Sequence, residues 1–133
     1  MIYSEEVMKH FKHPKNLGEI KNADGVGTVG NPRCGDVMKL YIKVGERTTD
    51  NGKRNKYIKD VKFQTLGCGA AIACSSMTTQ LVKGKSLDEA LKISNEKVNE
   101  ALGELPKSKY HCSILAEQAI KSAINDYQHK QVS

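Results

Sequence analysis

The sequence predicts an α+β fold, in which a small antiparallel sheet of about three strands is packed by helices. Apolar and polar residues alternate along residues 36–44 and again along 57–66, and the turn-forming triplet Asp50-Asn51-Gly52 lies between these segments. Residues 111–127 instead repeat their apolar side chains with the period of a helix. A sheet with helices packed on it is typical of this fold class.

One helix and one strand are expected before the alternating segments. Ser4 can cap a short helix that ends at residues 10–12, just before a proline. Residues 25–30 predict a short strand. The polar segment 45–56 is expected to form the loop of an antiparallel hairpin, because it contains the turn triplet.

Helices follow the hairpin. One apolar stripe predicts a helix that ends near Gly84: Ala70, Ala73, Cys74, Met77, Thr78 and Leu81. Ser86 and Glu89 have the spacing of a capping box for a short helix over residues 87–93, and another short helix is expected over 96–102. With no repeat or linker, we expect a single domain over residues 1–133.

Composition limits the class of protein. The chain has 133 residues, 38% hydrophobic and 27% charged, which is typical of a soluble globular domain and not of a membrane protein. Residues 1–16 lack the unbroken apolar run of a secretory signal, so we expect a cytoplasmic protein. Its four cysteines are then expected to be free or ligating thiols rather than disulfides.

The net charge of +6 is partly local. Residues 39–62 hold eight basic side chains against three acidic ones. Such a patch could meet an acidic partner or a nucleic acid. We favour a solvated hairpin, because aromatic residues are scarce and no nucleic-acid motif accompanies the charge.

Three cysteines are candidate ligands of one metal or iron-sulfur site. Cys34 and Asp36 are two residues apart, so in an extended segment both can face the same point. The alternative is an inert Cys34 beside an Asp36 that serves a turn. Cys68 and Cys112 each fall at the expected start of a helix, where a thiolate is exposed and electrostatically favoured.

Two neighbouring residues are interpreted from their positions. His111 precedes Cys112 directly, and its imidazole can bind a metal, carry a proton or simply pack. Cys74 shares the apolar stripe of its helix, so we interpret it as a buried small residue and not as a ligand. No tight pair of cysteines marks a closed zinc site, which predicts an open and exchangeable centre.

Several sequence blocks follow one another along most of the chain: YSEEVMKHFKHPKNLGEI, GNPRCGD, GCGAAIACSS, VKGKSLDEAL and HCSILAEQAIKSAI. In these blocks and their order the sequence resembles the IscU/NifU N-terminal family of iron-sulfur cluster assembly scaffolds. This resemblance implies that Cys34, Cys68 and Cys112 accept sulfur and bind the cluster, while Asp36 and His111 complete or tune the site. The implied cargo is a transient 2Fe-2S cluster built from ferrous iron, and zinc is the alternative metal for the site without a cluster.

The resemblance also implies partners. Persulfide sulfur would come from a cysteine desulfurase, and the cluster would pass to apo-proteins, with the scaffold acting as a monomer or as a cluster-bridged homo-oligomer. In this family an Hsp70-type chaperone grips a segment that often reads LPPVK. Here residues 105–109 read LPKSK, which puts chaperone-driven release in doubt. Cys74 replaces a small residue such as serine, and the basic hairpin 45–56 is longer than usual.

Two other functions remain open. A zinc-dependent sulfur-relay protein of the SufU type shares the fold and the cysteines, but it usually has an insertion between the second and third cysteines and lacks the histidine that His111 provides here. A basic nucleic-acid-binding domain with structural zinc is the second alternative, which the dispersed cysteines oppose. No catalytic triad, phosphate-binding loop or cofactor fingerprint indicates an enzyme.

Overall fold

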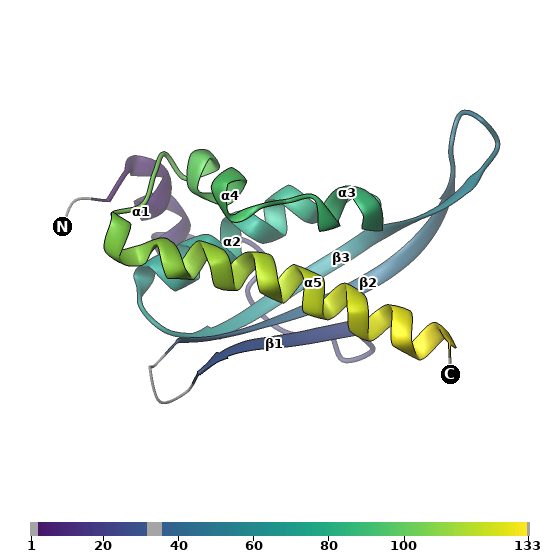
Figure 1. Cartoon of the computed structure of the whole chain (residues 1–133), viewed down its shortest axis with the longest axis horizontal. Helices are drawn as coiled ribbons and strands as arrows, with labels where there is room; N and C mark the ends of the chain where they lie inside the picture. Colours follow the sequence, from purple (N-terminus) through teal and green to yellow (C-terminus); the bar gives the residue numbers. More distant parts are fainter. Residues whose placement is uncertain (1–2, 32–35, 133) are drawn as a thin grey trace.

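The computed structural model describes residues 3–31 and 36–132, and it confirms the α+β class. Its sheet is antiparallel in the order β1-β2-β3, formed by Gly25–Asn31, Asp36–Thr48 and Arg54–Leu66. All three strands were expected from the sequence. Figure 1 shows that β2 and β3 continue beyond the helices as a projecting hairpin.

The predicted bounds of the hairpin loop are wrong. Residues 45–56 were expected to form the loop, but Glu46 pairs with Lys56 across strands that continue almost to the turn. The reason is that backbone hydrogen bonds between β2 and β3 can continue where the strands have no apolar face, so no alternation of apolar residues marks this part of the strands. Side chains reinforce this part, since Arg47 lies over the ring of Tyr57 at 4.6 Å from its centroid.

The five predicted helices are all present in the predicted order, and a short 3₁₀ helix that was not predicted lies before the last of them. The described helices are α1 (Glu5–Lys12), α2 (Gly69–Val82), α3 (Leu87–Leu91), α4 (Asn95–Ala101), the short 3₁₀ helix η2 (Lys107–Lys109) and α5 (Tyr110–Val132). Ser4 accepts a hydrogen bond from the Val7 N–H at 3.1 Å, and Ser86 with Glu89 forms the expected capping box. Helix α5 extends past the predicted residues 111–127.

Close packing holds α5 along the sheet. It lies against β1 and β2, while α2 covers β3 (Figure 1). A Cβ atom added to Gly27 would lie 2.5 Å from the backbone nitrogen of Ala123, so only glycine lets this helix approach. The Asp126 carboxylate accepts a hydrogen bond from the Val26 N–H at 2.9 Å, which fixes the far part of α5 to β1.

The core lies between the sheet and these helices. Its largest fully buried side chains come from the inner sheet face and from the helices: Phe63, Met38, Leu40, Ile42, Ile58, Leu102, Ile120 and Ile124. Among the described residues, no helix combines the length and the apolar character needed to cross a membrane. The start of β2, the N-terminus of α2 and the first turn of α5 meet at one end of the sheet, opposite the projecting hairpin (Figure 1).

Candidate metal centre

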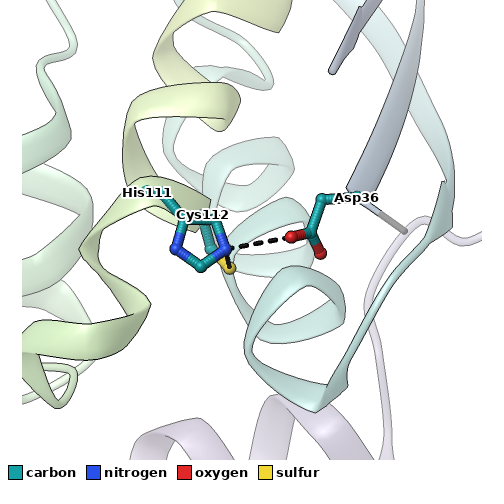
Figure 2. A group of neighbouring side chains, drawn as sticks. All are labelled: Asp36, His111 and Cys112. Carbon is teal, nitrogen blue, oxygen red and sulfur yellow. Dashed lines mark hydrogen bonds and ion pairs between the residues drawn. The ribbon is translucent and has the colours of Figure 1, made fainter. Parts of the chain in front are cut away.

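Three potential ligands converge where β2 begins and α5 begins. One donor atom from each of Asp36, His111 and Cys112 lies within 4.8 Å of the other two. Nε2 of His111 is 3.0 Å from Oδ2 of Asp36 and 3.5 Å from Sγ of Cys112 (Figure 2). Within the described residues, this is the group of histidine, cysteine and acidic side chains whose donor atoms are close enough for one cation.

The geometry indicates which imidazole nitrogen bears a proton. An ionised carboxylate only accepts hydrogen bonds, so the Nε2–H of His111 donates to Asp36. Sγ of Cys112 lies close to the same nitrogen. A cation bound by these three atoms would therefore displace the Nε2 proton, which couples metal binding to proton release.

Cys112 differs from the sequence-based expectation. It falls in the first turn of α5, as predicted, but its side chain is buried in the core. Burial, followed by the nearby Cys68 and Asp36, raises the pKa of the Cys112 thiol to about 12. The expectation of an exposed, favoured thiolate is therefore wrong for Cys112, because the helix turns this side chain inward.

The expectation of an accessible and electrostatically favoured thiolate is confirmed for Cys68. Cys68 is the N-cap residue of α2 and is partly exposed. Burial raises the pKa of its thiol, but the N–H groups of Ala71 and Ala70, the Lys109 ammonium and the Cys112 side chain together lower it below the ordinary value. The Cys68 sulfur makes no side-chain capping hydrogen bond. The N–H groups in the first turn of α2 therefore favour the thiolate mainly through the direction of their dipoles.

The glycine beside Cys68 serves packing rather than an unusual backbone. Neither Gly67 nor Gly69 has a positive φ. A Cβ atom on Gly69 would instead lie 2.8 Å from the ring of Phe11. Gly69 therefore lets α1 pack against the start of α2, close to the Cys68 sulfur.

Lys109 lies beside the candidate site and was not identified from the sequence. The Cys68 thiolate is the main cause that raises the pKa of the Lys109 ammonium, so the two side chains lie close enough to interact electrostatically. A basic residue three positions before Cys112, at the end of LPKSK, was visible in the sequence. Its position beside Cys68 depends on the direction in which η2 joins α5, and no local sequence pattern predicts that direction.

The structure thus gathers four of the five predicted site residues. Asp36, His111 and Cys112 form the compact group, and Cys68 interacts with Cys112 at its edge. The fifth, Cys34, lies outside the described residues. Cys74 is fully buried, as predicted, and burial strongly raises the pKa of its thiol.

This donor set suits a transition metal or an iron-sulfur centre. Thiolate and imidazole are ligands of iron and zinc, whereas the carboxylate is a harder and weaker partner for such metals. The exposed His111 and the partly exposed Cys68 leave the group reachable from solvent. The arrangement fits a centre whose metal can enter and leave.

Comparison with known proteins places the chain in a family. Residues 2–133 match the family model "NifU-like N terminal domain". The chain is 55% identical, over 97% of its length and 78% of the relative, to iron-sulfur cluster assembly scaffold protein IscU 1 of Archaeoglobus fulgidus. It is 54% identical to the IscU scaffold protein of Escherichia coli K12, and the match covers 98% of both chains.

A solved structure gives the same result for the fold. A candidate iron-sulfur cluster assembly scaffold protein for the SUF system, from Fervidobacterium islandicum, superposes with a TM-score of 0.64 at 27% identity. The match covers 92% of this chain and 96% of that one. From the family match and from its identity to the IscU proteins over nearly the whole chain, the protein belongs to the NifU-like N-terminal domain family and is a homologue of the IscU scaffolds.

Proposed function

We propose that this protein is a scaffold on which a 2Fe-2S cluster is assembled and from which it is transferred to apo-proteins. The observation that supports this most is the convergence of Asp36, His111 and Cys112 beside Cys68 at one end of the sheet. Relatives that match nearly all of this chain are named as iron-sulfur cluster assembly scaffolds. The protein acts as a carrier and not as an enzyme.

In this proposal Cys34, Cys68 and Cys112 are the thiolate ligands, and Asp36 or His111 is the fourth. Thiolates hold iron tightly, whereas a carboxylate or imidazole ligand binds more weakly. One weak ligand therefore gives the cluster a point at which it can be released. The 3.0 Å contact between the two candidates keeps both at the site, so either can take the fourth position.

Sulfur is supplied as persulfide by a cysteine desulfurase. An accepting thiolate of the scaffold attacks the terminal sulfur of the donor's Cys–S–SH group, a new S–S bond forms, and the donor cysteine leaves as a thiolate. Cys68 is suited to begin this exchange, because it is partly exposed and its pKa is lowered. The nearby Lys109 ammonium stabilises the attacking thiolate electrostatically.

Anaerobic reconstitution tests the proposal. The protein is supplied with ferrous iron, cysteine and a cysteine desulfurase, and cluster formation is followed by visible absorbance and by iron and sulfide analysis. We expect colour in the wild type and its loss in Cys34→Ala, Cys68→Ala and Cys112→Ala. Cys74→Ala is the matched control, since Cys74 is a core residue. A wild type that takes up no iron and sulfide, or a Cys74 variant as defective as the others, would contradict the proposal.

A zinc-dependent sulfur relay of the SufU type is the second candidate, and the similarity to the Fervidobacterium structure favours it. In that case the zinc-loaded protein would take up sulfur from the desulfurase without ever binding a 2Fe-2S cluster. The hydrogen bond between His111 and Asp36 opposes it, since the relay proteins usually lack this histidine. Involvement of a chaperone and a cluster-bridged oligomer stay predictions.

A further inference from the structure

A cavity lies between α1 and α2, away from the candidate metal ligands. Its volume is about 570 Å³, and its walls carry four basic side chains, Lys9, His10, His13 and Lys15, against the single acidic Glu6. Met77 of α2 adds an apolar wall. Met8 and Phe11, on a different flank of α1, and Tyr3, just before the helix, line a second pocket with Gly69 near the candidate metal centre, so the two sites are separate.

His10 is held rigidly in this wall. Its side chain is only 5% exposed, and its Nδ1 lies 2.7 Å from Oγ of Ser76. The same oxygen accepts a hydrogen bond from the Lys15 N–H, also at 2.7 Å. The Ser76 hydroxyl is then free to donate its own proton to Nδ1, which leaves the proton of the neutral imidazole on Nε2. Among the described residues no hydrogen bond reaches Nε2, and His10 lines the cavity, so the Nε2–H is available to a ligand bound there.

Two ammonium groups accompany this donor. Lys9 and Lys15 both lie near enough to the ring to lower the pKa of His10, after the larger effect of burial, while Glu6 opposes them. The backbone at Lys15 is anchored through Ser76, and the next residue, Asn16, donates to Oγ1 of Thr79 at 3.0 Å. The backbone that carries Lys15 is therefore anchored to α2, as is the His10 ring, while the ammonium groups of Lys9 and Lys15 are exposed.

We propose that this cavity binds a small organic phosphate. The phosphoryl group accepts hydrogen bonds from the Nε2–H of His10 and from the ammonium groups of Lys9 and Lys15, and the organic part lies over Met77. A phosphate monoester offers three terminal oxygens and close to two negative charges, which matches three donors from separate positions better than a carboxylate does. The cavity is also larger than a phosphate ion alone would fill.

A titration with phenyl phosphate tests this, at constant ionic strength and with the ring nitrogens of His10 followed by proton–nitrogen NMR. We expect saturable shifts of the His10 signals, and tighter binding of phenyl phosphate than of inorganic phosphate or benzoate. Lys15→Gln should weaken phenyl phosphate binding on the order of tenfold, by loss of one charge-assisted hydrogen bond. Lys21→Gln removes an equally exposed charge outside the cavity and should leave the affinity unchanged.

Three results would overturn the inference. The first is a linear, unsaturated response of the His10 signals to phenyl phosphate. The second is an equal loss of phenyl phosphate affinity in Lys15→Gln and Lys21→Gln, because the loss would then come from the lower net charge of the protein and not from the cavity. The third is tighter binding of benzoate than of phenyl phosphate, which would assign the cavity to carboxylates. Both lysine side chains are exposed, so these variants are expected to fold.

Discussion

Nε2 of His111 donates a hydrogen bond to Oδ2 of Asp36 across 3.0 Å, although the two residues are 75 positions apart in the chain. This bond closes the candidate metal centre between β2 and α5 (Figure 2). It also means that the two candidates for the weak fourth ligand are one coupled pair. Changing either residue alters what the other can do at the site.

Asp36→Ala should lengthen the lifetime of the assembled cluster. Removing the carboxylate leaves His111 as the remaining weak donor and removes one route for ligand exchange. The decay of visible absorbance after transfer to cluster-free buffer measures the lifetime, with the exposed Glu100→Ala as the control. Unchanged or faster decay in Asp36→Ala would count against the role given to this carboxylate.

The thiols should react in a fixed order. In a Cys34→Ser background, Cys68 is expected to be alkylated by iodoacetamide well before Cys112, and Cys74 last. The thiolate fraction rises with pH toward each pKa, so Cys68 begins to react at lower pH than Cys112, whose pKa is about 12. Peptide mass spectrometry at several pH values measures the order. Equal rates at Cys68 and Cys112 would contradict their assigned environments.

Lys109→Met should slow the alkylation of Cys68. The ammonium helps to lower the pKa of this thiol, so its loss shifts the pKa upward and reduces the thiolate present at neutral pH. We expect roughly threefold to tenfold slower modification, because each pKa unit changes the thiolate fraction about tenfold. Lys107→Met, an exposed lysine of the same short helix, is the matched control and should leave the rate unchanged.

His10 should make the protein sensitive to mild acid. Burial, with Lys9 and Lys15, lowers the pKa of His10 below its ordinary value of 6.5, so the unfolded chain binds this proton more readily. The contribution of His10 to the free energy of unfolding is therefore fully present above pH 6.5. It decreases as the pH falls below 6.5, by up to about 1.4 kcal/mol per pH unit. Urea unfolding between pH 5 and 8 should show a flatter dependence in His10→Gln than in the exposed control His13→Gln.

Two glycines should respond differently to alanine. In Gly27→Ala the new Cβ meets the backbone of α5 at 2.5 Å, and backbone atoms can move only if the helix shifts from the sheet. We expect a loss of about 3 kcal/mol or more. In Gly69→Ala it meets the partly exposed ring of Phe11, which can rotate away, so the loss should be about 1 kcal/mol. Urea denaturation compares them, and equal losses would contradict the packing described for α5.

The sequence predicted the elements better than their ends, for identifiable reasons. Alternation in β2 and the apolar stripe of α5 are local patterns that burial imposes, so both elements were found. The projecting part of the β2–β3 hairpin, where Glu46 pairs with Lys56, is held by backbone hydrogen bonds between the strands. Such bonds produce no pattern of apolar residues in the sequence. The approach of α5 to Gly27 likewise depends on contacts between distant segments.

The sequence predicted which candidate residues lie close together, but it did not predict the environment of each. Position at a helix N-terminus correctly indicated a favoured thiolate at Cys68. The same reasoning failed at Cys112, because the direction of a side chain within the first turn depends on what packs beside it. Lys109 was missed for a similar reason, since its partner Cys68 is far away in sequence.

The placement of His111 and Cys112 at the start of α5 has a consequence for how the protein is made. During translation the β2 carboxylate emerges early, whereas its imidazole and thiol partners emerge only with the segment that must dock onto β1 and β2. A nascent or truncated chain without a docked α5 presents scattered donors instead of a chelating group. The candidate chelating group therefore exists only in chains in which α5 has docked onto the sheet.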